Sequence, residues 1–103
     1  MDCKVILSPR AIQDPREIVR YISLDDPVAA EKFGYALIDA ALSLSTLPER
    51  GRFVPEFRDA MTREIIHGRY RIVYRLNQQQ KVVWVSRFWH AARGTPEIPP
   101  ADV

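Results

Sequence analysis

Three segments in the second half of the chain are rich in β-branched and aromatic residues, which is typical of β-strands. The middle segment also places its arginines and its Tyr70, Ile72 and Tyr74 on alternate sides, the two-residue period of a strand. The last of the three is apolar on both faces, so we expect it inside the sheet. Gly68 and the polar run at residues 77–80 separate the segments, which predicts tight turns and antiparallel pairing. A β-branched run at residues 3–8 predicts a further strand. The three later strands are expected at residues 62–67, 70–76 and 81–89.

A helical period of three to four residues follows the first predicted strand. Asp25, Asp26 and Pro27 predict the start of a long helix, and Pro48 predicts its end. Small residues on this helix would let a second helix approach closely. The expected buried face consists of Phe33, Leu37, Ala40, Leu44 and Leu47.

Two competing start signals precede this helix. Ser8 followed by Pro9 is one, and Asp14 followed by Pro15 and Glu17 is the other. Because a proline inside a helix removes a hydrogen bond and clashes with the preceding turn, we expect a loose turn at residues 9–13. A helix capped by Asp14 and ending near Ser23 would then follow.

The order of these elements is β-α-α-β-β-β. It predicts an α+β fold in which an N-terminal helical hairpin packs on one face of a mostly antiparallel four-stranded sheet. Residues 48–60 are expected to form an irregular loop. The length predicts one domain over residues 1–103, and the three prolines among residues 95–103 predict an irregular tail.

Charge is distributed unevenly along the chain. Residues 1–47 carry five basic and seven acidic residues, whereas residues 48–103 carry ten basic and six acidic residues. Nine of those ten basic residues are arginine, whose planar group grips phosphate and carboxylate. The arginine-rich half therefore indicates an anionic partner.

Other features of the composition exclude several classes of protein. A single cysteine rules out an internal disulfide, and no apolar run approaches the roughly 20 residues that span a bilayer. No signal peptide is evident, so we expect a soluble cytoplasmic protein. Two histidines 23 positions apart and one distant cysteine do not form a zinc set, and we expect neither metal nor cofactor.

The arginines lie along the predicted strands in a pattern that favours one face. If residues 70–76 form a strand, Tyr70 and Ile72 point one way while Arg71 and Arg75 point the other. We expect the arginine face to be left open by the helices and to bind an anion or a macromolecular target. The predicted binding residues are Arg63, Arg69, Arg71, Arg75 and Arg87.

Several short motifs occur in a characteristic order along residues 5–93. The motifs are Ser8 to Ala11, Tyr21-Ile22, Asp26-Pro27, Ala29-Ala30, Pro48 to Arg52, Tyr70 to Arg75, and His90 with Arg93. With these motifs in this order, the sequence resembles the RelE/ParE superfamily, which contains the toxins of bacterial type II toxin–antitoxin systems. The resemblance implies a cognate antitoxin as partner, in a toxin–antitoxin hetero-oligomer.

The superfamily contains two activities. RelE-like members cut messenger RNA on the ribosome, whereas ParE-like members bind DNA gyrase and generally lack the nuclease residues. In a RelE-like nuclease, the resemblance implies catalytic roles for Arg71, His90 and Arg93, with Arg71 on the scissile phosphate and His90 as a proton shuttle. Glu56 and Glu64 are further candidate bases, although Glu64 on a strand is more simply the ion-pair partner of a neighbouring arginine.

Two departures from the nuclease pattern favour the ParE-like branch. No tyrosine or histidine follows Arg93, and the loop at residues 48–60 contains no lysine. We therefore expect a toxin that inhibits DNA gyrase without catalysis of its own. The alternative is a RelE-like, metal-independent and ribosome-dependent endoribonuclease that acts on mRNA.

Overall fold

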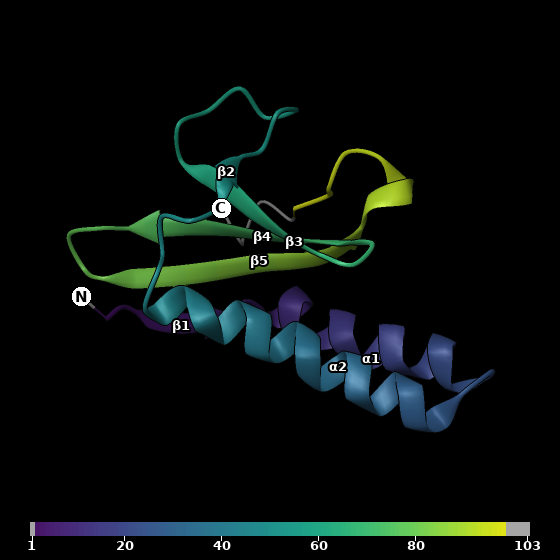
Figure 1. Cartoon of the computed structure of the whole chain (residues 1–103). Helices are drawn as coiled ribbons and strands as arrows, with labels where there is room; N and C mark the ends of the chain where they lie inside the picture. Colours follow the sequence, from purple (N-terminus) through teal and green to yellow (C-terminus); the bar gives the residue numbers. More distant parts are fainter. Residues whose placement is uncertain (1, 99–103) are drawn as a thin grey trace.

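The helices and the sheet form two layers, with both helices on one face of the sheet (Figure 1). The computed structural model describes residues 2–98. Its elements are β1 (Lys4–Leu7), α1 (Pro9–Ser23), α2 (Pro27–Leu42), the 3-10 helix η1 (Ser43–Ser45), β2 (Arg52–Phe53), β3 (Thr62–His67), β4 (Tyr70–Asn77), β5 (Val82–His90) and the 3-10 helix η2 (Ala91–Arg93).

The strands lie in the order β1-β5-β4-β3-β2. β1 pairs in parallel with β5, and the other neighbours are antiparallel. The predicted α+β class, the mostly antiparallel sheet and the helical hairpin on one face are confirmed. The strand number is corrected from four to five, because the expected loop at residues 48–60 contains the two-residue strand β2. A strand this short carries no detectable period, so the alternation of side chains could not reveal it.

The expected start of the first helix is wrong. α1 begins directly after Ser8, whose hydroxyl oxygen accepts a hydrogen bond from the Ala11 amide at 3.0 Å. Pro15 lies inside the helix, and Asp14 is buried instead of capping an end. The contacts that Asp14 makes with β5 outweigh the local cost of a proline within the helix.

The second helix begins as predicted and ends earlier. Asp26 caps it by accepting a hydrogen bond from the Ala29 amide at 3.1 Å. α2 stops at Leu42 and continues as η1, so Leu47 is 61% exposed where a buried residue was expected. Small residues do bring the helices together, because a side chain on Gly34 would collide with Val19 on α1.

The core lies between the helices and the sheet. Ile72 and Tyr74 on β4 face it, together with Leu37 of α2 and Leu44 of η1. The Tyr74 hydroxyl donates to the Pro48 carbonyl at 2.7 Å and accepts from an amide of the loop before β2. The strand side that was expected to point inward does so, and Tyr74 also fixes the path of the chain after α2.

The outer edge of β5 is completed by side chains of α1 and its cap. β1 pairs with β5 only as far as Val85. Beyond that point the Ser8 hydroxyl donates to the Ser86 carbonyl at 2.9 Å, and the Asp14 carboxylate accepts from the Phe88 amide at 3.0 Å. These two bonds satisfy the Ser86 carbonyl and the Phe88 amide, which have no strand partner because β1 has already ended.

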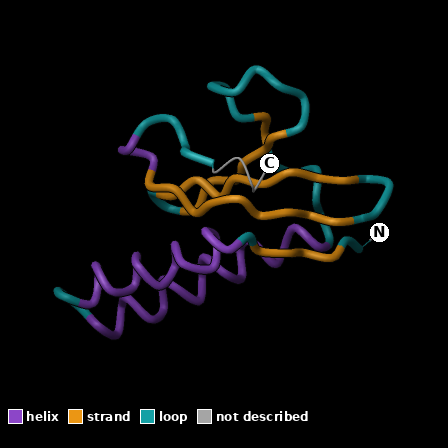
Figure 2. The backbone as a smooth tube through the Cα atoms, turned by 180° about the vertical axis from the view of Figure 1, so that it is seen from behind, coloured by secondary structure: helices purple, strands orange, loops and turns teal. Residues whose placement is uncertain are grey.

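The opposite face of the sheet is partly covered by a loop and by a segment whose one helix, among the described residues, is the short 3-10 helix η2. Both views place the loop between β2 and β3, and the segment after β5, on the side away from α1 and α2 (Figures 1 and 2). Residues 94–98 contain no helix or strand, and the rest of the predicted tail lies outside the described residues. Within residues 2–98, no helix has the length and apolarity needed to cross a membrane.

Replacement of Asp14 by asparagine tests the role of this buried carboxylate. Because Arg87 would lose the negative charge that compensates it, we expect Asp14→Asn to reduce the free energy of unfolding by about 3 kcal/mol. The melting temperature should fall by about 10 °C or more. Asp39→Asn, on the exposed side of α2, is the matched control and should leave the melting temperature unchanged. Equal melting temperatures for the Asp14 variant and the unmodified chain would contradict this role.

Candidate functional site

The register of the sheet divides the predicted arginines between its two faces. Arg71 lies opposite Trp89, and Arg75 lies opposite Trp84, on the face away from the helices. A bulge between Val73 and Tyr74 brings Arg87 opposite Val73, and therefore onto the same face.

Two of the five predicted binding arginines do not lie on this face. Arg63 is opposite Tyr74, whose side chain enters the core, so it lies on the helix side of the sheet. Arg69 is exposed in the turn between β3 and β4. Of the five predicted binding residues, three therefore lie on one face, one lies on the other and one lies in a turn. The expectation that Arg69 shares a strand face with Arg71 and Arg75 is corrected, because Arg69 lies in the turn before β4.

Arg71 is bonded to carboxylates of its own chain. Its Nε donates to Glu64 Oε1 at 2.5 Å, and its two terminal nitrogens donate to the two oxygens of Glu56, each at 2.7 Å. One terminal nitrogen also donates to the Gly94 carbonyl at 3.2 Å. The residue is only 7% exposed. The expectation of an open cationic group is therefore wrong for Arg71, because this guanidinium already binds two carboxylates of its own chain.

Glu64 is the centre of this network. It is 1% exposed and accepts hydrogen bonds from Arg71 and from Arg52 Nε at 2.8 Å. Its expected role as the ion-pair partner of a neighbouring arginine is confirmed. A buried carboxylate with two guanidinium partners is compensated in both charge and hydrogen bonding.

Glu56 closes the network from the loop between β2 and β3. The hydrogen bonds from Arg71 lower the pKa of the Glu56 carboxyl to about 2, and the same bonds raise the pKa of Arg71 further above its ordinary value. A carboxylate with so low a pKa is a weak base at neutral pH. Glu56 is therefore suited to hold Arg71, and not to abstract a proton.

Arg87 is also neutralised within the chain. It donates to both oxygens of Asp14, from Nε at 2.8 Å and from a terminal nitrogen at 3.1 Å. Its other terminal nitrogen donates to the Glu97 carbonyl at 2.6 Å. At 2% exposure, Arg87 is not accessible to an anionic guest, and the expectation of an open cationic group is wrong here too.

The segment after β5 is fixed to this face by several of the same side chains. The Trp89 indole N–H donates to the Gly94 carbonyl at 3.1 Å, beside the bond from Arg71. The Arg93 guanidinium lies 3.9 Å from the centre of the Trp89 ring, which is a cation–π contact. Arg93 is exposed, so of the three predicted catalytic residues it is the most accessible.

Arg63 and Arg75 remain without a carboxylate partner among the described residues. Arg63 donates to the carbonyls of Glu49 and Gly51, and its guanidinium lies over Phe53. Arg75 donates only to the Met61 sulfur, at 3.2 Å. The charges of these two arginines are therefore available to a partner.

His90 lies on the opposite side of the sheet from Arg71. It is paired with Tyr70, which packs against the core, whereas Arg71 is paired with Trp89. The His90 Nδ1 atom accepts a hydrogen bond from the Ala92 amide at 3.1 Å, which places it as the cap of η2. The edge of its ring contacts Tyr70, with 5.0 Å between ring centres.

His67 also belongs to the helix side, since it is paired with Tyr70 across the turn between β3 and β4. Both histidines of the chain are therefore separated from the arginine face by the sheet itself. No group of three or more metal-binding side chains occurs among residues 2–98.

Sequence reasoning missed the roles of Asp14 and Trp89. The buried residues of α1 are Ala11, Asp14, Pro15 and Ile18, so Asp14 occupies the apolar side of a helix. An acidic residue in phase with buried positions is a signal for an internal ion pair. Its partner, Arg87, is 73 positions away and could not be identified from local pattern.

The bond between Glu56 and Arg71 predicts how stability depends on pH. The pKa of Glu56 is about 2 in the folded chain and 4.5 ordinarily, so its contribution is complete above pH 4.5 and is lost as the pH falls toward 2. At neutral pH, Glu56→Gln should reduce the free energy of unfolding by about 1 kcal/mol, and this difference should shrink with acidification. Denaturant unfolding at a series of pH values measures it. A difference that does not change with pH would refute the assignment.

Comparison with known proteins identifies the family. The family model described as ParE toxin of the type II toxin–antitoxin system parDE matches residues 5–94. No curated protein sequence matches the chain significantly.

Several solved structures share the fold. The toxin–antitoxin complex RelBE2 from Mycobacterium tuberculosis matches with 22% identity and a TM-score of 0.66, over 87% of this chain and 99% of that one. The chromosomal ParDE system from P. aeruginosa matches with 16% identity and a TM-score of 0.70, over 85% and 95%. A mutant E. coli toxin RelE in the free state matches with 18% identity and a TM-score of 0.60, over 91% and 88%. The family match covers nearly the whole chain, which therefore belongs to the ParE toxins of type II toxin–antitoxin systems.

Proposed function

We propose that this toxin inhibits growth by binding DNA gyrase in the cytoplasm, without chemistry of its own, and that a cognate antitoxin neutralises it in a hetero-oligomer. Gyrase is proposed as the target because the ParE-like members of the superfamily bind it. The absence of catalysis is argued from the geometry of the arginine face. The antitoxin is expected because the family and the RelBE2 and ParDE structures are toxin–antitoxin systems.

The observation that carries the proposal is the separation of Arg71 from His90. Metal-free RNA cleavage needs a base for the ribose hydroxyl, an acid for the leaving oxygen and a cation on the phosphate, all within reach of one another. Arg71 and His90 point to opposite faces of one sheet, so they cannot contact the same phosphate in this arrangement.

The internal bonds of Arg71 support the same conclusion. A phosphate that displaced Glu56 would have to break a bidentate ion pair, and Glu64 would still hold Nε. Arg93 is accessible and lies over Trp89 on the arginine face. His67 and His90 lie on the other face of the sheet, so neither can transfer a proton at a phosphate that Arg93 binds. The arrangement favours a structural network over a nuclease site.

A pair of assays separates the two activities. Added to purified gyrase and relaxed plasmid, the protein should block supercoiling in a concentration-dependent way. Primer extension on translating ribosomes should show intact mRNA at the same concentrations. Cleavage at defined codons, with supercoiling unaffected, would contradict the proposal and establish the RelE-like alternative.

Replacement of His90 by glutamine tests the absence of proton transfer in living cells. Glutamine can still accept the hydrogen bond from the Ala92 amide, but it cannot shuttle a proton at neutral pH. We expect His90→Gln to inhibit growth as strongly as the unmodified toxin. His67→Gln is the matched control. A His90 variant that is folded by circular dichroism and yet harmless would count against a toxin without catalysis.

A further inference from the structure

The outer side of α2 carries three large apolar side chains. In Figure 1, α2 is the nearer of the two helices, and among residues 2–98 no other element passes in front of it. The buried side of this helix consists of Ala30, Gly34, Leu37 and Ala41. On the outer side, Val28, Tyr35 and Leu42 are 65%, 66% and 48% exposed. A single exposed apolar side chain is normal on a protein surface, but a group of them marks an interaction site.

These three residues form a row along the helix. Val28, Tyr35 and Leu42 are spaced by seven positions, which is about two turns of helix and about 10 Å along the axis. Each step of seven positions rotates the side chain by only about 20°, so the row stays on one side of α2. Apolar residues at this spacing are the pattern along which a second helix packs.

Two charged residues lie together on one flank of the row. Lys32 comes three positions before Tyr35, and Asp39 comes four positions after it. Because they are seven positions apart they share a side of the helix, and both are exposed. Among residues 2–98, neither takes part in an ion pair. This flank therefore carries a positive charge before its centre and a negative charge after it.

The two ends of α2 also carry opposite charges. Asp25 and Asp26 are exposed just before its first residue. Arg50 is held at the other end, because its guanidinium donates to the Ser43 hydroxyl at 2.6 Å. Within the described part of the chain Arg50 forms no ion pair. A second helix that runs in the opposite direction would bring each end of α2 to the opposite charge.

Two copies of α2 fit each other when they run antiparallel with Tyr35 at the centre. Val28 of each copy then faces Leu42 of the other, and Tyr35 faces Tyr35. The two-fold axis keeps the charged flanks on the same side, and Lys32 comes within about 1.5 Å, along the helix axis, of the level of Asp39 in the second copy. Every contact forms twice, as in any two-fold interface.

Parallel pairing of the two helices is less favourable. It would place Asp25 and Asp26 beside their own copies and would align the two helix dipoles. Like charges placed together oppose association. Lys32 would then meet Glu31 on the other flank of the second helix, and no longer Asp39.

We propose that two copies of this chain associate through the outer sides of their α2 helices, which pack antiparallel about Tyr35. A second copy is the occupant that this surface specifies, because the apolar row is symmetric about Tyr35 and the charges of the flank exchange sign across it. The helix has 16 residues and is about 24 Å long, so an interface built on one helix pair is small. We therefore expect a dissociation constant of roughly 10 µM. The dimer does not depend on the gyrase proposal, because it is derived from α2 and its ends alone.

Sedimentation velocity of the full-length protein, at about 1 to about 100 µM, tests the association. The average mass should rise from one chain toward two over this range. Lys32→Glu and Asp39→Lys should each weaken association at least about tenfold, because like charges then meet twice. The exchanged variant Lys32→Glu/Asp39→Lys should restore it. Arg58→Glu, in the loop between β2 and β3, is the matched control and should associate like the unmodified chain.

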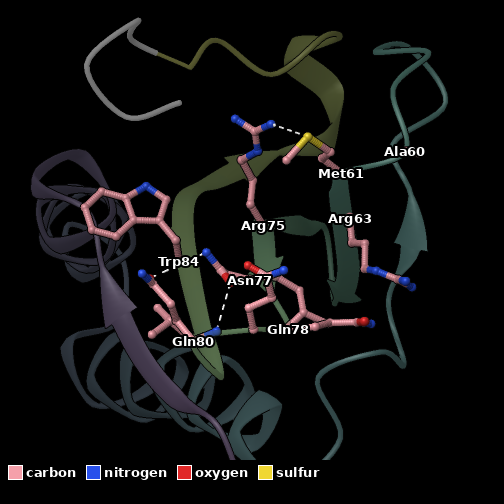
Figure 3. Close-up of a pocket in the computed structure, with 11 residues that line it drawn as sticks. Ala60, Met61, Arg63, Arg75, Asn77, Gln78, Gln80 and Trp84 are labelled. Carbon is pink, nitrogen blue, oxygen red and sulfur yellow. Dashed lines mark hydrogen bonds between the residues drawn. The ribbon is translucent and has the colours of Figure 1, made fainter.

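Disulfide cross-linking tests which residues face each other. In a Cys3→Ser background, Tyr35→Cys should form a cross-linked dimer on oxidation, because its two copies meet at the two-fold axis. Val28→Cys and Leu42→Cys should cross-link with each other when mixed, and neither should cross-link alone. Gln80→Cys, in the hollow at the tip of the β4–β5 hairpin (Figure 3), is the matched control and should not cross-link.

Each outcome decides the proposal, provided that circular dichroism shows the variants to be folded. Association that the exchanged variant restores, together with cross-linking at Tyr35→Cys, supports the dimer. A chain that stays monomeric over the whole range would overturn it. So would an exchanged variant that associates as weakly as the single ones, or cross-linking of Val28→Cys with itself or of Gln80→Cys. Both measurements use the toxin alone, so a failure here is distinct from a failure of the gyrase proposal.

Discussion

A buried guanidinium requires negative charge nearby, and this requirement organises the face of the sheet that the helices leave uncovered. Arg71 receives that charge from Glu64 on the adjacent strand and from Glu56 on a loop, and Arg87 receives it from Asp14 on α1. Desolvation of an unpaired charge would cost several kcal/mol, so the loop and the helix are held in place by the arginines that they neutralise. The same bonds remove these arginines from the surface that a partner can reach.

Much of the fold could be predicted, because its main elements have clear periods and strong start signals. The three later strands are six to nine residues long and rich in β-branched and aromatic residues, and Asp26 with Pro27 marks the beginning of α2. The errors concern features that local pattern does not encode. β2 is too short to show a period, and α1 continues through Pro15 because a tertiary contact of Asp14 outweighs a local preference.

The candidate site was less predictable, because the sign and spacing of charges do not say which charges are already paired. The pattern of β4 correctly separated its arginines from its core residues. It could not show that Glu56, 15 positions away, would bind Arg71, or that a bulge would shift the pairing of β5. As a result, the arginines expected to bind a partner divide into a buried pair, Arg71 and Arg87, and an accessible set. Arg63 and Arg75 lie near the hairpin tip, and Arg69 is exposed in the turn between β3 and β4. Among the described residues none of these three forms an ion pair, so their charge remains available.

The central claim is that Arg71 is a structural residue whose partner is Glu64. A double-mutant cycle of Arg71→Met and Glu64→Leu, measured by denaturant unfolding at neutral pH, tests it most directly. Each single replacement removes one of the two charged partners of a buried group, because Arg52 still pairs with Glu64 and Glu56 still pairs with Arg71. Each should therefore cost about 2–3 kcal/mol, whereas the double replacement should cost much less than their sum. The account would be contradicted if Arg71→Met were as stable as the unmodified chain, since Arg71 would then be free to serve a partner or a substrate.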